Sequence, residues 1–260
     1  MTNKISYIPI IDTVRERGKQ LSEFLKNTSL QLWKTLNNEV FLIGGGDGFM
    51  MHQIKETSLK DGKFVSGNKY FWVNCGTLGF LLNDIPFDQI PENLEDTVEY
   101  KITPLQVTID ADGEQQTLYA INDIVIGNSV FDYFSFDVES ADFSQQSIKG
   151  TGLIVSSALG SSAYWHNNKG PLMPQNANLV GIMGIATLPF NYKILPKQEV
   201  SIKVSGRKKA IVGVDGTRIE PNTIKEIKII PSAESFSLLF HKDLDFETKR
   251  TLLAEEKLRN

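Results

Sequence analysis

The sequence predicts an α/β domain followed by a β-rich domain, and three observations lead to this fold class. Strand-like and helix-like runs alternate over residues 1–101. Over residues 102–240, strand-like runs, one of them over residues 117–127, follow one another with short turns and little helix between them. The length of 260 residues slightly favours two modest domains over one large domain. The tail, residues 241–260, has the pattern of a terminal helix that could pack back on the first domain.

The first domain is predicted to begin with a strand, a helix and a second strand. Residues 5–10 have strand character. The charged segment that follows carries Val14, Leu21 and Leu25 at helical intervals. Residues 39–43 then have strand character, with four consecutive apolar residues at positions 40–43. This order is typical of a parallel α/β sheet.

A glycine loop at residues 44–48 (Gly-Gly-Gly-Asp-Gly) joins that second strand to a helix. Glycines can adopt positive φ and let phosphates approach the backbone, and the N–H groups that open a helix favour an anion. Asp47 repels phosphate unless a cation bridges the two or its charge serves to take a proton. The loop therefore suggests phosphoryl transfer to a hydroxyl group. The alternative is a plain strand-to-helix turn with Asp47 as its N-cap.

A second glycine loop follows the strand at residues 70–73 and contains Asn74, Gly76 and Gly79. In open α/β sheets, ligands bind at the carboxyl ends of the strands. We therefore expect this second loop to face the same crevice as Asp47.

In the second domain, two Asp-Gly turns and one break in the strands stand out. Residues 110–114 and 215–217 are typical of hairpin turns. Residues 160–167 are small, polar or aromatic and could open a short helix. Such a break between strands usually holds a ligand or a subunit contact.

The composition narrows the class of protein further. Hydrophobic residues make up 41% of the chain, and the formal net charge of −4 argues against a nucleic-acid partner. Cys75 is the single cysteine, so it excludes an intrachain disulfide and is expected to be a buried packing residue. No basic and apolar leader and no membrane-spanning run is visible, so we expect a cytoplasmic protein without a membrane partner.

Three common nucleotide-binding motifs are excluded. Residues 44–49 do not fit G-x-G-x-x-G because residue 49 is phenylalanine. The chain contains no Walker A sequence and no protein-kinase set of H-R-D and D-F-G.

Six motifs nevertheless occur along almost the whole chain in the order seen in NAD kinases, and the sequence resembles that family. They are Gly45–Gly46–Asp47–Gly48, Asn74-x-Gly76-x-x-Gly79-Phe80-Leu81, Asn122–Asp123, Gly152–Leu153–Ile154–Val155–Ser156 leading to Gly160–Ser161–Ser162–Ala163–Tyr164, Gly170–Pro171, and Val214–Asp215–Gly216. The first motif also resembles phosphofructokinases and diacylglycerol or sphingosine kinases. The Asn-Asp pair and the Gly-Ser-x-Ala-Tyr segment are more specific to NAD kinases.

The resemblance implies a two-domain NAD kinase-like fold and an NAD kinase activity. The substrates would be NAD and ATP, or polyphosphate in place of ATP, with Mg²⁺ or another divalent cation. The resemblance also implies a homodimer or homotetramer. It assigns no protein ligand to the metal.

The resemblance also implies roles for individual residues. Asp47 would take the proton from the 2′-hydroxyl of NAD, and the amides of Gly45, Gly46 and Gly48 would hold ATP phosphates. Ala186 would reach the site of a neighbouring subunit. The implied NAD-binding residues are Asp47, Gly48, Asn122, Asp123, Lys149, Thr151, Leu159, Ser162, Ala163, Tyr164, Asn167 and Ala186.

Several positions depart from the family pattern and leave two other functions open. Thr151 stands where an aspartate is usual, residues 157–159 replace Thr-Pro-Thr, and Lys149 replaces a frequent arginine. These changes are compatible with a catalytically weakened NAD(P)-binding protein. A lipid or sugar kinase that shares the glycine–aspartate loop is the other alternative. For single residues the plainer reading is structural, with Asn122 and Asp123 ending a strand and Tyr164 buried as a packing aromatic.

Overall fold

The computed structural model describes residues 5–32, 40–77, 79–127, 132–188, 190–206 and 209–259. The chain divides into two compact units: unit 1 contains Met1–Ile102 and Glu234–Asn260, and unit 2 contains Thr103–Ala233. The boundary drawn from the sequence put residues up to 240 in the second domain. The structure instead places the strand near the C-terminus in the sheet of unit 1.

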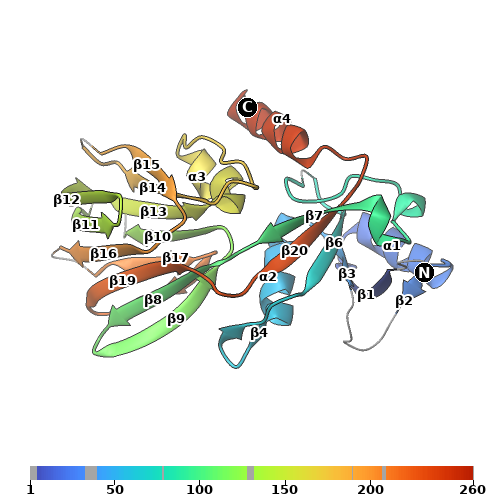
Figure 1. Cartoon of the computed structure of the whole chain (residues 1–260), viewed down its shortest axis with the longest axis horizontal. Coiled ribbons are helices and arrows are strands. Elements are labelled where there is room, and N and C mark those ends of the chain that lie inside the picture. The colour runs from blue at the N-terminus through green and yellow to red at the C-terminus, as the bar shows by residue number, and fades with distance from the viewer. Residues whose placement is uncertain are drawn as a thin grey trace. The chain divides into compact units, whose positions relative to one another are not determined.

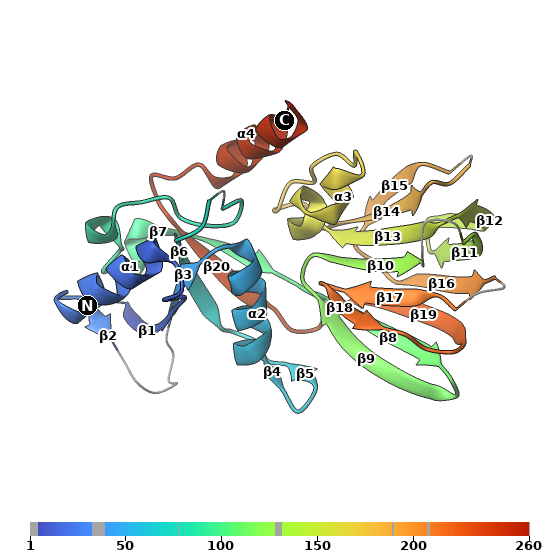
Figure 2. The same cartoon turned by 180° about the vertical axis from the view of Figure 1, so that it is seen from behind.

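Unit 1 is built on a six-stranded sheet of order β2-β1-β3-β6-β20-β7 (Figures 1 and 2). Neighbouring strands run parallel except β7, which is antiparallel to β20. The strands are β1 Ser6–Ile11, β2 Gln31–Leu32, β3 Val40–Gly45, β6 Lys69–Asn74, β7 Thr97–Ile102 and β20 Phe236–His241. A small hairpin, β4 Leu59–Lys60 with β5 Lys63–Phe64, follows α2.

Helices pack against this sheet because their apolar positions recur with helical spacing. They are α1 Glu16–Lys26, α2 Asp47–Ser58 and α4 Phe246–Arg259, with short 3-10 turns η1 Phe87–Gln89 and η2 Leu94–Asp96. Helix α1 buries Leu21 and Leu25 in one cluster with Phe71. The hydroxyl of Tyr70, the preceding residue in β6, lies 2.7 Å from the hydroxyl of Ser58 in α2. Because successive strand residues point to opposite faces, α1 and α2 cover opposite faces of the sheet.

The start of α4 packs on unit 1 through aromatic rings. Phe246 stacks on Phe240 of β20 with ring centroids 4.1 Å apart, and Tyr100 of β7 meets both rings edge-on. Stacked and edge-to-face aromatic pairs contribute beyond the area they bury. The C-terminal helix is thus fixed to the two strands at one edge of the sheet.

Unit 2 is made of two six-stranded antiparallel sheets of order β15-β14-β13-β10-β17-β18 and β12-β11-β16-β19-β8-β9. One cluster of buried side chains draws from both sheets and forms the core. The strands are β8 Leu105–Ala111, β9 Glu114–Ala120, β10 Asp123–Gly127, β11 Phe134–Ser140, β12 Phe143–Gly150, β13 Gly152–Ser157, β14 Leu179–Ile185, β15 Tyr192–Pro196, β16 Val200–Ser205, β17 Ile211–Val214, β18 Thr217–Ile219 and β19 Ile224–Pro231. The short turn η3 Leu159–Ser162 and the helix α3 Tyr164–Asn167 occupy the predicted break.

The predicted fold class, an α/β region followed by a β-rich region, is confirmed. Two details of the sequence reading are wrong. Residues 117–127 do not form one strand, because the chain turns at Ile121 and Asn122 and passes from one sheet of unit 2 to the other. Val14 does not belong to the first helix, which begins at Glu16, and its side chain is 89% exposed.

Cys75 is a buried member of the unit 1 core, as predicted. Burial raises the pKa of its thiol to about 11, although the nearby Arg17 guanidinium acts in the opposite direction. Within the described ranges, no helix combines the length and the apolar character needed to cross a membrane.

Candidate functional site

The candidate site in unit 1 lies where three neighbouring parallel strands, β1, β3 and β6, reach their carboxyl ends. The two glycine loops follow β3 and β6, and they approach each other closely. A Cβ atom built on Gly76 would lie 3.2 Å from the Cα atom of Gly46. Side chains at this point would therefore crowd the opposite loop, and the glycines leave the backbone open at this edge of the sheet.

Asp47 is the first residue of α2, and its carboxylate is bonded across the site. The backbone N–H groups of Phe80 and Leu81 donate to its two oxygens at 3.1 and 3.2 Å. The residue at the N-cap position is Gly46, and no side chain caps the helix. The plain reading of Asp47 as an N-cap is therefore wrong. The second loop positions this carboxylate, as expected from the order of the strands.

The charge state of Asp47 is set by opposing effects. Asp47 is half-buried, and this burial raises the pKa of its carboxyl. The N–H groups of Leu81 and Phe80 and the positive charge of Lys249 lower that pKa, and the negative charge of Asp84 raises it. Burial is the largest of these causes, so the net shift of the pKa is upward. A carboxylate with a raised pKa is a better proton acceptor than an exposed one.

A network of side chains holds the second loop in place. The Oδ1 atom of Asn74 accepts from the backbone N–H of Gly76 at 2.8 Å, and its Nδ2 atom donates to Asp84 at 2.8 Å. Lys249 of α4 donates to the carbonyl of Leu82 at 2.7 Å and pairs with Asp84 at 2.9 Å. The C-terminal helix therefore supports the loop that bonds the Asp47 carboxylate.

Gly79 in the same loop has φ +90°, a conformation that favours glycine. A Cβ atom at this position would also lie 2.6 Å from the Nδ2 atom of Asn74. Both the backbone conformation and the space thus require glycine here.

In unit 2, the Asn122–Asp123 pair lies at a turn that is anchored from another hairpin. The carboxylate of Asp215 accepts from the backbone N–H groups of Ile121, Asn122 and Asp123 at 2.7, 2.8 and 3.1 Å. Asp215 and Gly216 both have positive φ, as in the predicted Asp-Gly hairpin turn. Asp215 therefore fixes the turn that presents the predicted pair.

The two members of this pair differ in their surroundings. Burial, together with the negative charge of Asp215, raises the pKa of Asp123 to about 7, and the backbone N–H of Tyr164, which bonds the carboxylate, acts in the opposite direction. The side-chain oxygen of Asn122 is buried and has no hydrogen-bond partner among the described residues. A buried acceptor without a partner costs free energy unless a ligand or water satisfies it.

The segment after β13 packs closely on that turn. A Cβ atom on Gly160 would come 2.1 Å from the backbone oxygen of Asn122, so glycine permits this contact. Trp165 is fully buried, and its indole N–H donates to the carbonyl of Pro171 at 2.8 Å. Tyr164, in contrast, is 42% exposed, so the alternative of a buried packing ring does not apply to it.

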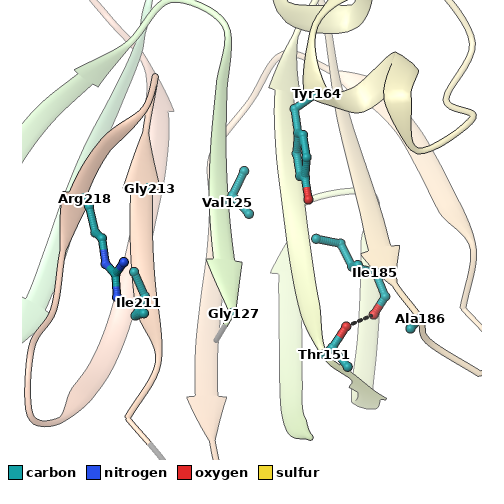
Figure 3. A pocket seen from close by; sticks show the side chains of 9 residues that line it. All are labelled: Val125, Gly127, Thr151, Tyr164, Ile185, Ala186, Ile211, Gly213 and Arg218. Carbon is teal, nitrogen blue, oxygen red and sulfur yellow. Dashed lines mark hydrogen bonds between the residues drawn. The ribbon is translucent and has the colours of Figure 1, made fainter. Parts of the chain in front are cut away.

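A cavity of about 540 Å³ opens on the sheet beside Tyr164 (Figure 3). Tyr164 points along the sheet toward Ile185, and Thr151 donates to the carbonyl of Ile185 at 3.1 Å. The cavity is lined by Val125, Gly127, Thr151, Tyr164, Ile185, Ala186, Ile211, Gly213 and Arg218. Three predicted NAD-binding residues, Thr151, Tyr164 and Ala186, are thus brought together.

The remaining predicted residues of unit 2 lie outside this lining. Leu159 and Ser162 are buried in η3, Ala163 is half-buried, and Asn167 is exposed at the end of α3. Lys149 is exposed in β12.

Two charged residues at the site in unit 2, Arg218 and Asp215, were not predicted from the sequence to act there. Arg218 of β18 lines the cavity and pairs with Glu220. Asp215 was predicted as a hairpin residue within one of the motifs and not as a support of the Asn122–Asp123 turn, because its partners lie more than ninety positions earlier in the chain. No local pattern could show that contact.

The fold, with its glycine loops at the carboxyl ends of parallel strands, is shared with solved structures of NAD and NADH kinases. The structure of yeast NADH kinase complexed with NADH aligns with a TM-score of 0.76 and 16% identity, over 96% of this chain and 87% of that chain. The structure of an NAD kinase from Archaeoglobus fulgidus in complex with ATP aligns with a TM-score of 0.71 and 17% identity, over 96% of this chain and 98% of that chain.

Sequence comparison agrees with the fold. The chain is 25% identical to NAD kinase of Rickettsia rickettsii over 219 residues, which are 81% of this chain and 83% of that protein. It is 26% identical to NAD kinase of Rhizobium meliloti over 226 residues, 84% of each. No family model matches the chain. The predicted resemblance to NAD kinases is thereby confirmed in sequence and in fold.

Proposed function

We propose that this chain transfers the γ-phosphoryl group of ATP to the adenosine 2′-hydroxyl of NAD and so forms NADP. The related NAD kinases and the shared fold support this activity. The observation that carries the proposal is the Asp47 carboxylate, held by the N–H groups of Phe80 and Leu81 beside the glycine loops.

Asp47 is proposed as the base of the reaction. Its carboxylate takes the proton of the 2′-hydroxyl while that oxygen forms a bond to the γ-phosphorus, and the bond from the γ-phosphorus to the bridging oxygen breaks to release ADP. The upward shift of the Asp47 pKa suits a proton acceptor. The backbone amides of Gly45, Gly46 and Gly48 are proposed to hold the phosphates of the donor.

The divalent cation is proposed to arrive with ATP as part of the substrate. Among the described residues, no group of three or more His, Cys, Asp or Glu side chains could hold a metal ion. Mg²⁺ in phosphoryl-transfer sites commonly binds phosphates and needs only one or two protein carboxylates. The chain's own contribution is then to bind the phosphates and to orient the hydroxyl group.

The NAD-binding role is proposed for residues of unit 2. The buried Asn122 oxygen would accept from the adenine amino group, which would satisfy its missing hydrogen bond. The ionised Asp123 would accept from the ribose hydroxyls. The exposed ring of Tyr164 offers a stacking face beside the cavity. The other proposed NAD contacts are Gly48, Lys149, Thr151, Leu159, Ser162, Ala163, Asn167 and Ala186.

Three further parts of the proposal concern the donor, the assembly and the compartment. Polyphosphate is proposed as a possible replacement for ATP, because both present a terminal phosphate. A homodimer or homotetramer is proposed, in which Ala186 would reach a neighbouring subunit's site. Light scattering of the purified protein measures its mass in solution, and a monomer would contradict the assembly. The proposed location is the cytoplasm.

The test is formation of NADP from NAD, ATP and Mg²⁺ by the parent protein and by two charge-neutralised variants. Asp47→Asn is expected to lower kcat at least about 100-fold, because general-base catalysis contributes about 10²–10⁴. Asp88→Asn removes the same charge from an exposed position of unit 1 and is expected to retain full activity. Equal activity of the Asp47→Asn protein and the parent would refute the assigned base.

The same assay separates the two alternative functions. The uncharged Thr151, in place of the usual aspartate, is the reason to consider a catalytically weakened NAD(P)-binding protein. Such a protein would bind dinucleotide in calorimetry without forming NADP. A lipid or sugar kinase would form no NADP and would consume ATP with another hydroxyl compound in a substrate panel. Either result would overturn the proposed reaction.

A further inference from the structure

Arg15 places a guanidinium group beside the two glycine loops of unit 1. Arg15 lies between β1 and α1. It therefore follows the carboxyl end of β1, the strand beside β3 in the sheet. A Cβ atom built on Gly46 would lie 3.8 Å from the Nη2 atom of Arg15. A Cβ atom built on Gly76 would lie 3.7 Å from the Nη1 atom of Arg15. Both terminal nitrogens therefore lie near the glycine backbone.

The ion pair of Arg15 leaves its two terminal nitrogens, Nη1 and Nη2, available to bind a ligand. Its Nε atom pairs with Asp12 Oδ2 at 3.5 Å, and the side chain is 50% exposed. This pair uses the inner nitrogen of the guanidinium. Within the described residues, Asp12 is the only acidic group within ion-pair distance of Arg15.

The neighbouring cations Arg17 and Lys19 make contacts elsewhere. Arg17 donates to the carbonyl of Ile85 at 3.1 Å and lies over the ring of Phe87. Lys19 pairs with Glu16 of the same helix at 3.7 Å and is 60% exposed. Of these three cations, Arg15 is the one that lies against the glycine loops.

We propose that the guanidinium of Arg15 binds a phosphate of the phosphoryl donor at Gly46 and Gly76. The ligand is a polyphosphate chain, carried either by a nucleoside triphosphate or by inorganic polyphosphate. A planar guanidinium can donate two parallel hydrogen bonds to phosphate oxygens. The glycines leave room for those oxygens, because neither carries a Cβ atom. This inference rests on the proposed function, since it names a residue that binds the donor of that reaction.

The positive charge of Arg15 also offsets a conflict within the site. Asp47 brings a negative charge to the loop where the donor phosphates are proposed to bind. A cation at Gly46 reduces the repulsion between that carboxylate and the phosphates. It further favours the charge that develops on the donor as its terminal bond breaks.

The test measures donor binding by calorimetry, with Mg²⁺-ATP and Mg²⁺-tripolyphosphate as separate probes. Arg15→Met is expected to weaken binding of ATP at least about tenfold, because charge-assisted hydrogen bonds are lost. Arg15→Lys keeps the charge without the planar fork and is expected to fall between the parent and Arg15→Met. Lys19→Met is the matched control, since it removes one positive charge from α1, the helix that Arg15 precedes.

The outcomes separate this inference from the proposed reaction. If Arg15→Met and Lys19→Met bind both probes as the parent does, the role of Arg15 is refuted, while NADP formation by the parent stands. If the parent forms no NADP but Arg15→Met alone weakens ATP binding, the donor site stands and the proposed reaction fails. A parent that binds neither probe refutes the donor site itself. Weakening toward ATP alone assigns the site to nucleoside triphosphates, and weakening toward both probes assigns it to the phosphate chain.

A structural role for Arg15 would give a different result. NAD affinity and the melting temperature are expected to stay within the range of the Lys19→Met control. A parallel loss of NAD affinity and of thermal stability in both Arg15 variants would refute a role specific to the donor.

Discussion

Replacement of Asp215 by asparagine tests how the hairpin in unit 2 supports the Asn122–Asp123 turn. Asp215 accepts from three consecutive backbone N–H groups at 2.7, 2.8 and 3.1 Å. Asparagine has one side-chain oxygen, and its amide nitrogen would face at least one of these N–H groups as a second donor. The substitution therefore removes at least one bond and leaves one donor unsatisfied.

The magnitude follows from those bonds. A hydrogen bond to a charged group contributes about 1.5–3 kcal/mol, and an unsatisfied buried donor costs about 1–3 kcal/mol. We therefore expect Asp215→Asn to lower the free energy of unfolding by about 2.5–6 kcal/mol. The substitution also removes the negative charge of Asp215, which is the second cause, after burial, of the raised pKa of Asp123. That pKa is expected to fall below about 7.

The assay combines thermal unfolding with calorimetric titration of NAD at pH 8. Asp112→Asn is the matched control, because Asp112 also has positive φ before a glycine and accepts from the backbone N–H groups of Asn222 and Thr223 at 2.8 Å each. The control position is exposed, so its loss of stability should be smaller, and its NAD affinity should equal that of the parent. Asp215→Asn should lose both stability and NAD affinity.

Two results would refute this reasoning. The first is an Asp215→Asn protein that melts at the same temperature as the Asp112→Asn protein. The second is an unchanged NAD affinity in a protein whose turn has been destabilised, which would show that the Asn122–Asp123 turn does not bind NAD.

Three further predictions concern single residues. Lys249→Met should lower the free energy of unfolding by about 1–3 kcal/mol through the lost bonds to the second loop, and it should raise the pKa of Asp47 further; an unchanged acid limb of the pH profile of kcat/KM would contradict it. Gly79→Ala should destabilise unit 1 by about 1–3 kcal/mol from backbone strain, with an added loss of activity from the clash described above, whereas Gly62→Ala, also at positive φ but in open space, should show the strain alone; equal activity of the two variants would exclude the clash. The pKa of Asp123 is raised to about 7, above the unfolded value of about 3.9, so its contribution to stability is complete below about pH 4 and is lost as the pH rises through 7; Asp123→Asn should flatten this dependence in thermal melts between pH 4 and 8, and an unaltered slope would refute the shift.

Much of the fold was predictable because its signals are local. The apolar run of β3, the glycine loop and the spacing in α2 each depend on backbone and side-chain preferences within a few residues. The Asp-Gly turn at residues 215–216 is set in the same way by two residues that adopt positive φ. The strand boundaries near residue 121 were less accurate, because a change of sheet leaves no periodic signal in the sequence.

The candidate sites were predictable only in part. The order of motifs pointed to Asp47, Asn122 and Asp123. The structure gives the Asp47 carboxylate two backbone N–H partners, and it bonds the backbone N–H groups of Asn122 and Asp123 to Asp215. The sequence did not show that Arg218 lines the cavity, since a single arginine in a strand has many structural roles. Nor did it show that Arg15 lies against the glycines.

The sequence by itself determined the glycine–aspartate loop between a strand and a helix, because φ preferences and hydrophobic spacing act over neighbouring residues. Tertiary structure alone decided what bonds the Asp47 carboxylate: two N–H groups 33 and 34 positions later in the chain. It likewise brought β20 from the end of the chain into the sheet of unit 1, beside β6. Such contacts depend on how separate segments pack together, and no local preference of the chain specifies them.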